Sequence, residues 1–568
     1  MALFPRTRDS FHKTTLALAA AATLAACTGV PAPAPLPATQ TSAPGTPPSA
    51  SKRSTPAPPS TPSSPDAGAR PLGWGPQQRD QDAAAAAVAA MTPEQKAGQV
   101  LMPFFTGPDA EAHAATIEGL HLAGSIIMGD NVPLDAQKQV DPAAMAVITD
   151  RLARAARADG RTWPGLIGVD QEGGVVARLD APLTEWPTPM SYGAAGNVDL
   201  TKDAGRAVAS ELAPLGFNVD FAPVTDATIG SADPTIGARS MSGNPDAAGT
   251  LGVAFSQGMQ EAGVLPAVKH FPGHGSVTVD SHQDLPVQPA GVADLEARDW
   301  KPFRAAIAAG VPMVMTGHIA VPALEPGVPA SLSKPTYAAL RGMGFNGVAV
   351  TDALNMGAVQ KQYPDGSAAV AALAAGADLL LMPTDVAQAH AAIVGAVAGG
   401  SLPAARLDEA AQRVATMMIW RGRTAAASPG TAPGSGGEIS ARVSATAVTV
   451  LSGPCSGPLV SGSVQVAGGS PQDRARFEAA AAKAGLAVGA GPVVSLIGYG
   501  GAPAQGDIAV TLDAPWPLQD SAAPVKMALY GRSPGAFDAL AAVLAGKAPA
   551  PGKLPAAVGT FPAGTGCP

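Results

Sequence analysis

Eight short apolar segments, separated by stretches with helical periodicity, recur between residues 100 and 383. They lie at 100–105, 124–129, 166–171, 217–223, 265–270, 312–318, 347–352 and 378–383. Because these segments are apolar throughout rather than alternating with polar residues, they are typical of parallel strands buried on both faces. Eight β/α units in succession predict a TIM (β/α)8 barrel with insertions. A doubly wound open sheet is the alternative.

The predicted barrel occupies residues 76–423 and is followed by a linker at 424–438, rich in Gly, Pro and Ser. Its first clear helix follows Thr92, because Thr92 can cap the helix, Pro93 suits the first turn, and Gln95 completes a capping box. Residues 439–568 form a smaller unit with strand-like runs at 493–500, 507–513 and 525–531. This second unit is predicted to be an α/β sandwich domain, and it contains neither a phosphate loop nor a dinucleotide fingerprint.

The N-terminus has the pattern of an export signal. Arg6, Arg8 and Lys13 precede an apolar run that is too short to span a bilayer, and Leu24 to Cys27 resemble a bacterial lipobox. We therefore expect residues 1–27 to be a signal peptide, Cys27 to be lipidated, and the protein to be anchored to the outer face of the cell membrane. A cleavable signal without lipid is the alternative. Residues 28–75, rich in Pro, Ser and Thr, predict a disordered tether.

The net charge of the chain narrows the range of its binding partners. A formal net charge of −8 argues against a nucleic-acid partner.

Once Cys27 is assigned to lipid, Cys455 and Cys567 remain in an oxidising compartment as candidates for a disulfide. Two free thiols are the alternative.

Polar residues end several of the apolar segments. They are Asp170, Lys269, His270, His318 and Asp352. Because catalytic groups of a TIM barrel lie at the C-terminal ends of its strands, these residues predict one shared site.

Residues 269–282 read KHFPGHGSVTVDSH and hold three of the eight histidines. The spacing of His270 and His274 suits two zinc ligands on one helix face, but Pro272 and the flanking glycines predict a loop instead. No HExxH glutamate is present, so we predict neither a metal site nor any other cofactor.

Asp280 and His282 are separated by one serine, so both side chains point the same way in an extended or turn conformation. The carboxylate can then hold the imidazole, and an imidazole titrates close enough to neutral pH to give and take a proton. The alternative is an aspartate that caps a turn beside a surface histidine.

Asp352 ends an apolar segment at the predicted mouth of the barrel, where it could attack a carbon centre. A carboxylate nucleophile with a separate acid/base group is the arrangement of a retaining glycosidase. Here a histidine would replace the usual second carboxylate. An aspartate that caps a helix after the strand is the alternative.

These residues resemble glycoside hydrolase family 3, and within it the bacterial β-N-acetylglucosaminidases that act on peptidoglycan fragments. The resemblance covers residues 92–420. It is carried by GVDQEGG (168–174), FNVDFAPVTD (217–226), IGARS (236–240), KHFPGHG with DSH (269–282) and VTDALNM (350–356).

The resemblance implies Asp352 as nucleophile, His282 as acid/base and Asp280 as its partner. It also implies a set of residues that hold the sugar: Asp170, Arg178, Arg239, Lys269 and His270. For these the alternative is a buried salt bridge that supports the barrel. His274 and His318 are left outside the catalytic set. Met241 and Val175 depart from the residues common in the family, which affects the prediction of sugar specificity and not that of the reaction.

The implied function is an exo-acting hydrolase that removes terminal N-acetylglucosamine from glycans or muropeptides without a cofactor. Two alternatives remain. Some family members with a histidine acid/base transfer the glycosyl group to phosphate, since histidine does not repel that anion. The chain could also be a non-catalytic lipoprotein that binds wall sugars.

Overall fold

The computed structural model describes residues 67–363, 365–424, 430–502 and 505–568. Each of the eight apolar segments contains a strand. Six strands form one parallel sheet, in the order β2 (Gly124–Ile126), β3 (Leu166–Val169), β4 (Val219–Asp220), β5 (Leu265–Phe271), β6 (Met313–Thr316) and β9 (Val348–Thr351). The remaining two, β1 (Leu101–Met102) and β10 (Leu380–Leu381), form a parallel pair.

Backbone hydrogen bonds extend from the six-stranded sheet to this pair. The N–H of Ala123, just before β2, donates to the carbonyl of Leu101 at 3.1 Å. At the other edge, Val350 of β9 forms a parallel bridge with Leu379, just before β10. Each edge of the sheet is therefore linked to one strand of the pair.

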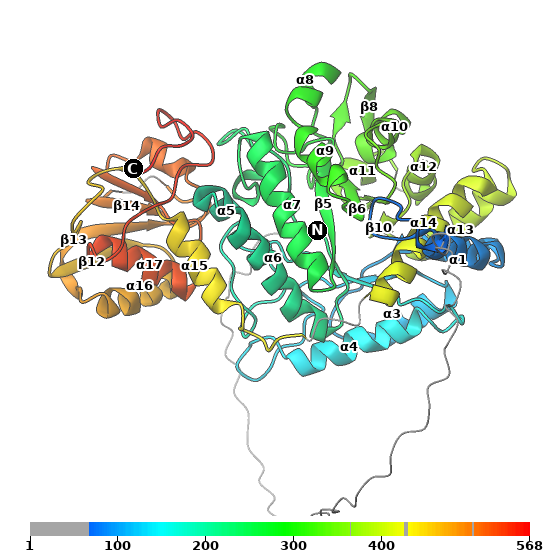
Figure 1. Cartoon of the computed structure of the whole chain (residues 1–568), viewed down its shortest axis with the longest axis horizontal. Helices are drawn as coiled ribbons and strands as arrows, with labels where there is room; N and C mark the ends of the chain where they lie inside the picture. The colour runs from blue at the N-terminus through cyan, green and yellow to red at the C-terminus, as the bar shows by residue number, and fades with distance from the viewer. Residues whose placement is uncertain (1–66, 364, 425–429, 503–504) are drawn as a thin grey trace, which may run out of the picture. The chain divides into compact units, whose positions relative to one another are not determined.

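Helices follow the strands and cover the sheet, as α7 and α9 do beside β5 (Figure 1). Those of the first unit are α1 (Gln78–Ala89), α2 (Pro93–Gln99), α3 (Glu111–Gly119), α4 (Pro142–Ala155), α5 (Met190–Ala195), α6 (Val198–Leu212), α7 (Pro245–Glu261), α8 (Val292–Ala297), α9 (Lys301–Ala308), α10 (Lys334–Gly342), α11 (Gly357–Gln360), α12 (Ser367–Ala375), α13 (Val386–Ala398) and α14 (Ala404–Thr424). A small antiparallel hairpin, β7 (Ala320–Val321) with β8 (Glu325–Pro329), extends from the loop after β6.

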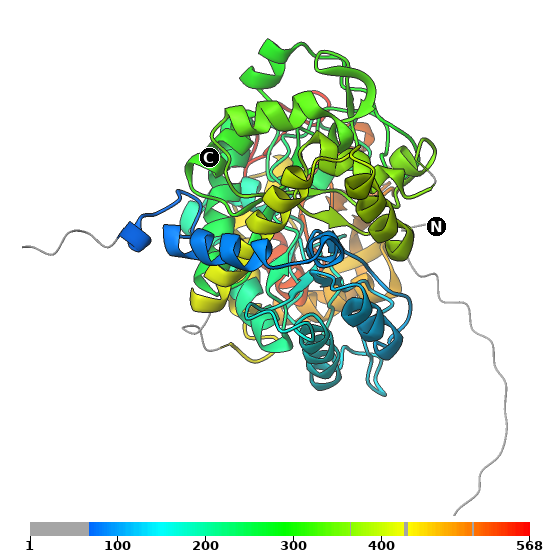
Figure 2. The same cartoon turned by 90° about the vertical axis from the view of Figure 1, so that its right-hand side faces the viewer.

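The start of helix α2 has the capping interactions that its sequence predicts. Thr92 caps α2, and Thr92 and Gln95 form the predicted capping box. The segment before it differs from the prediction, because Trp74 lies within the predicted tether (28–75) yet is buried in the core of this unit. Helix α1 packs along α14 (Figure 2). Arg423 of α14 and Asp80 of α1 form an ion pair of 2.8 Å. The end of the predicted tether thus belongs to the folded unit.

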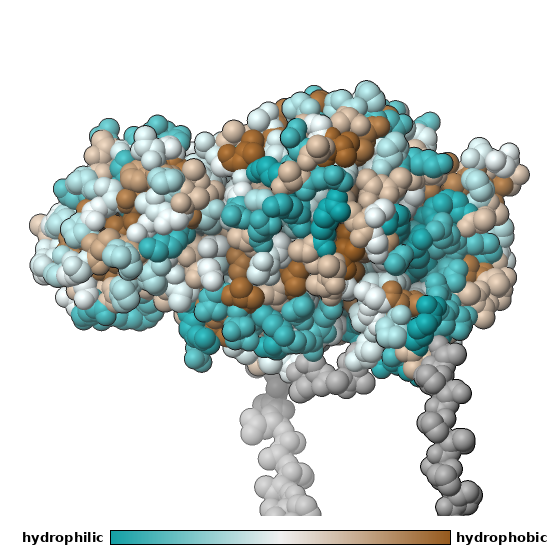
Figure 3. Space-filling model, turned by 45° about the horizontal axis from the view of Figure 1, so that its top comes forward, coloured by the Kyte–Doolittle hydropathy of each residue, from teal (hydrophilic) through white to brown (hydrophobic). Residues whose placement is uncertain are grey.

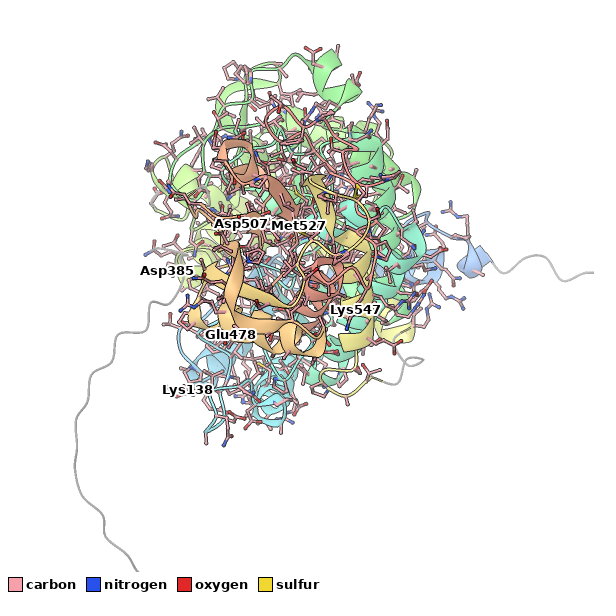
Figure 4. The ribbon with its side chains drawn as sticks, turned by 90° about the vertical axis from the view of Figure 1, so that its left-hand side faces the viewer. Lys138, Asp385, Glu478, Asp507, Met527 and Lys547 are labelled. Atoms are coloured by element: carbon pink, nitrogen blue, oxygen red, sulfur yellow. A yellow bond between two sulfur atoms is a disulfide. The ribbon has the colours of Figure 1, made fainter. Side chains whose placement is uncertain are left out.

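The second unit is a five-stranded mixed sheet. Its order is β11 (Thr449–Ser452), β15 (Val525–Ala528), β14 (Ile508–Thr511), β13 (Ala487–Ile497) and β12 (Ser463–Gly468), with β11 antiparallel to β15 and the other pairs parallel. Figure 4 shows this sheet, with Asp507 just before β14 and Met527 within β15 labelled. The predicted segment 493–500 contains the C-terminal part of β13, and the predicted segments 507–513 and 525–531 contain all of β14 and all of β15.

Apolar residues cover both faces of the mixed sheet, because successive side chains of a strand point to opposite sides. Leu496 packs with Phe477 of α16 (Pro471–Lys483) and Phe537 of α17 (Pro534–Leu544). The next residue, Ile497, belongs to a cluster with Met190 of α5, in the first unit. Helix α15 (Gly437–Ala447) leads into this sheet, and a disulfide joins Cys455 to Cys567.

Among the residues that the structure describes, no helix has both the length and the apolar character needed to cross a membrane. On the face drawn in Figure 3, hydrophobic residues form small patches among hydrophilic ones. The predicted signal peptide and its Cys27 lie outside the described residues.

Candidate active site

The parallel strands bring the predicted site residues to one edge of the sheet. Asp170 follows β3 directly, Lys269 and His270 lie in β5, and Asp352 follows β9 directly. Since all these strands run in the same direction, their carboxyl ends share one edge. Two groups of side chains gather there, one around Lys269 and one around Asp352.

Lys269 is the centre of a buried ion cluster. Its Nζ donates to Oδ1 of Asp170 at 2.9 Å and lies 2.6 Å from Oε1 of Glu172. Arg178 approaches the other oxygen of Asp170 at 3.4 Å. Burial by itself would raise the pKa of Asp170, but the charges of Lys269 and Arg178 outweigh it and lower that pKa. Asp170 is therefore ionised, and its Oδ2 has only a weak interaction, with Arg178.

Glu172 joins the predicted residue Arg239 to this cluster. The guanidinium of Arg239 donates to both carboxylate oxygens of Glu172, through Nε and Nη2, at 2.8 Å each. Burial alone would raise the pKa of Glu172, but Arg239 and Lys269 hold it well below its usual range. Glu172 lies within the motif GVDQEGG, but no role was predicted for it from the sequence. Its position two residues after Asp170 was the available signal, because residues i and i+2 of an extended segment share a side.

Asp226 is a second residue that the sequence analysis missed. Its Oδ2 accepts hydrogen bonds from the main-chain N–H of His270 at 3.0 Å and from the ring Nδ1 at 2.7 Å. Its Oδ1 accepts from the main-chain N–H of His274 at 2.7 Å. Asp226 thereby fixes the turn after β5 and the tautomer of His270, since a carboxylate requires a proton on Nδ1.

The predicted pair of Asp280 and His282 is present. Asp280 Oδ1 lies 2.7 Å from His282 Nδ1 and accepts the main-chain N–H of His282 at 3.0 Å. Burial would raise the pKa of Asp280, but these two hydrogen bonds and the charge of His282 lower it. The ionised carboxylate holds the proton of the imidazole on Nδ1, which leaves Nε2 as the nitrogen that can exchange a proton.

The loop that carries this pair is tied to the segment after Asp352. The N–H groups of Gly357 and Ala358, at the start of α11, donate to the carbonyls of His282 and Ser281 at 3.3 Å each. A side chain at Gly357 would meet the His282 carbonyl oxygen at 2.8 Å, so only glycine allows this approach. On the other side of the loop, His274 Nε2 and Ser281 Oγ are 2.8 Å apart. The loop of His282 is thereby joined to the segment that follows Asp352.

The surroundings of Asp352 keep its side chain ionised. The N–H of Ala353 donates to its Oδ1 at 2.8 Å, and the carbonyl of Ala353 accepts from Nε2 of the buried His318 at 2.9 Å. Burial alone would raise the pKa of Asp352, but His318, His270, this N–H and His282 hold it well below its usual range. A carboxylate that stays ionised can act as a nucleophile or as a base.

The site therefore brings together Asp170, Arg178, Arg239, Lys269 and His270 on one side and Asp280, His282 and Asp352 on the other. Both ring nitrogens of His318 have hydrogen-bond partners: Nε2 donates to the carbonyl of Ala353 at 2.9 Å, and Nδ1 lies 2.7 Å from Oγ of Ser331. Across the described ranges, no group of three or more His, Cys, Asp or Glu is arranged to hold a metal ion. The arrangement combines the ionised carboxylate of Asp352, the oriented imidazole of His282, and a polar cluster around Lys269.

Residues 92–417 match the N-terminal domain of glycosyl hydrolase family 3. The chain belongs to this family. It is therefore a glycoside hydrolase, and its family domain contains every residue of the site described above.

Three relatives of this family 3 hydrolase are informative. It is 33% identical over 339 residues to β-hexosaminidase LpqI of Mycobacterium tuberculosis, with 58% of this chain and 83% of that protein covered. It is 34% identical over 336 residues to β-hexosaminidase A of Pseudoalteromonas piscicida, covering 53% of this chain but only 55% of that longer protein. A family 3 β-N-acetylglucosaminidase structure from Paenibacillus superposes with a TM-score of 0.74 at 30% identity, covering 82% of this chain and 99% of that one.

Proposed function

We propose that this hydrolase is a retaining exo-β-N-acetylglucosaminidase that removes terminal, non-reducing N-acetylglucosamine from peptidoglycan fragments. The observation that carries the proposal is the hydrogen-bonded Asp280 and His282 pair, tied by its loop to the segment that follows Asp352. The β-hexosaminidase relatives and the Paenibacillus structure support the choice of sugar. We further propose that the eight parallel strands form a closed (β/α)8 barrel with this site at its mouth.

In the first step, Asp352 attacks the anomeric carbon of the N-acetylglucosamine, and the bond to the leaving oxygen breaks. His282 donates its Nε2 proton to that oxygen, while Asp280 stabilises the imidazolium from the other side. The products of this step are a glycosyl ester on Asp352 and a released alcohol, with His282 neutral.

In the second step, Nε2 of His282 takes a proton from a water molecule as the water attacks the anomeric carbon. The ester bond to Asp352 breaks, which regenerates the carboxylate and releases the sugar with its original β configuration. The same imidazole thus serves as acid and then as base.

The ion cluster around Lys269 suits the sugar itself. Asp170, whose Oδ2 has only a weak interaction with Arg178, can accept hydrogen bonds from two sugar hydroxyls. Arg178 and Lys269 can donate hydrogen bonds to the oxygens of those hydroxyls. Arg239 and His270 complete the proposed binding set, with Glu172 and Asp226 fixing their orientation.

The proposed location is the outer face of the cell membrane, with a lipid on Cys27. Metabolic labelling with an alkyne fatty acid tests this part separately. Label is expected on the wild-type chain and not on Cys27→Ser, and unlabelled wild type would contradict the anchor.

The reaction is tested with a disaccharide of N-acetylglucosamine β-linked to muramic acid, in phosphate-free buffer. Free N-acetylglucosamine, released by wild type and not by Asp352→Ala, is the expected result. A sugar phosphate that forms only when phosphate is added would identify a phosphorylase. Binding of the disaccharide with no turnover under either condition would identify a sugar-binding module.

A further inference from the structure

Tyr499 is an exposed aromatic residue of the second unit that the reaction above does not use. It lies in a tight turn directly after β13, where the N–H of Gly501 donates to the carbonyl of Gly498 at 3.0 Å. The residue is 52% exposed. The turn therefore presents an aromatic ring at the surface.

Tyr499 reaches the loop of the first unit that carries Arg239. Its hydroxyl donates to the carbonyl of Pro234 at 3.2 Å, and Arg239 ends the short helix η3 (Gly237–Arg239) that follows. Partial burial raises the pKa of the Tyr499 hydroxyl, and the charges of Asp233, Arg239 and Asp280 also act on it. Tyr499 therefore contacts the loop that leads to Arg239 and lies within electrostatic reach of Asp280.

Several ion pairs hold the Tyr499 turn in place. The guanidinium of Arg532 lies directly beneath Gly498, where a Cβ atom would meet it at 2.6 Å, and it is paired with Asp513 and Asp473. Arg476 donates to the carbonyl of Arg532 and forms two hydrogen bonds, of 2.6 and 2.8 Å, with Glu185 of the first unit. These contacts hold the Tyr499 turn in one position, so that less conformational entropy is lost when a ligand binds.

We propose that Tyr499 binds the leaving-group sugar and determines which glycans the enzyme accepts. The inference rests on the proposed function, because His282 protonates the leaving oxygen and the leaving group must therefore lie beside Asp280 and His282. One face of a pyranose ring carries only C–H groups, and an exposed aromatic ring suits that face. Val279, next to Asp280, and Ile229 are each 41% exposed and add apolar surface from the first unit.

The test compares two substrates of the full-length enzyme. One is the N-acetylglucosamine–muramic acid disaccharide, and the other is methyl N-acetyl-β-glucosaminide, whose one-carbon leaving group is too small to reach the Tyr499 ring. Tyr499→Ala is expected to lower kcat/KM for the disaccharide about tenfold and to leave the methyl glycoside within about twofold. Tyr499→Phe, which keeps the ring and loses the hydrogen bond to Pro234, is expected to retain most of the disaccharide activity.

Two outcomes would overturn the inference. An equal loss on both substrates would mean that Tyr499 only supports the Arg239 loop, and no loss on either would mean that it does not touch the substrate. If wild type turns over neither substrate, the proposed function itself fails, which is a distinguishable result.

Discussion

Nδ1 of His282 lies 2.7 Å from Oδ1 of Asp280, and the same oxygen accepts the main-chain N–H of His282 at 3.0 Å. One carboxylate oxygen thus fixes both the position of the imidazole and the nitrogen that carries its proton. Because an amide in place of Asp280 cannot stabilise an imidazolium, Asp280→Asn is expected to lower kcat about 100-fold, the lower end of what general acid–base catalysis contributes. Steady-state kinetics on the disaccharide measure this effect.

Asp284→Asn is the matched control, because Asp284 lies in the same loop but pairs with the exposed Lys361 at 3.2 Å. It is expected to keep full activity. An Asp280→Asn enzyme as fast as this control would contradict the acid/base role of the pair.

Glu172→Gln is expected to destabilise the fold. Glu172 is fully buried and is the ionic partner of both Arg239 and Lys269, so its removal leaves buried cations without compensation. A loss of about 3 kcal/mol in the free energy of unfolding is expected, whereas Glu296→Gln, in the exposed pair with Arg304, should change it by less than about 1 kcal/mol. Denaturant titration of both variants measures the difference, and equal stabilities would show that the cluster contributes only to sugar binding.

The residues that the sequence analysis selected are those that directly end a strand or match a family motif. Glu172 and Asp226 were missed because their roles depend on partners far away in sequence: Arg239 is 67 residues from Glu172, and His270 is 44 residues from Asp226. Nothing local distinguishes Asp226 from a carboxylate that caps a turn, and the one local signal for Glu172 is its position two residues after Asp170. The pairing becomes visible only when β3, β4 and β5 lie side by side.

The stability of the fold is expected to decrease as the pH falls from about 6.5 to about 4. Burial lowers the pKa of His113 and of His274 from 6.5 to about 4, so in this window the unfolded chain binds protons that the folded chain does not. The stabilisation is complete above 6.5 and is lost as the pH approaches 4. Each histidine contributes a slope of about 1.4 kcal/mol per pH unit.

His113→Gln tests this slope, because a glutamine can keep a hydrogen bond to Ser125 but does not titrate. Unfolding free energies measured between pH 7 and pH 4.5 should depend less on pH in the variant than in wild type. Identical slopes would mean that His113 is accessible to protons in the folded state.

The disulfide is expected to stabilise the second unit. Cys455 and Cys567 are 112 residues apart, and in the chain-entropy model a loop of this length contributes about 4 to 5 kcal/mol. Thermal melting with and without a reductant measures the effect, and the Cys455→Ser/Cys567→Ser double variant controls for other actions of the reductant. A melting temperature of wild type that does not respond to reduction would contradict the expected contribution.

In the second unit, the apolar pattern of the sequence predicts some strands and misses others. Strands β14 and β15 lie inside the mixed sheet and contain buried apolar residues, so their segments were recognised. Strands β11 and β12 form its edges, and β12 is largely exposed or half-buried. Because β12 is largely uncovered, its sequence lacks the continuous apolar run that marks a central strand. Strand β11 is buried from Thr449 to Leu451, so this reason does not apply to it.

The account depends most on the covalent bond between the sugar and Asp352. A fluorinated N-acetylglucosaminyl fluoride, whose ring fluorine slows the second step more than the first, should accumulate this intermediate. Mass spectrometry of the digested protein is predicted to find one added glycosyl group, on the peptide that contains Asp352. A glycosyl group on a different residue, or an active enzyme that is inactivated by the reagent without any added mass, would contradict the account.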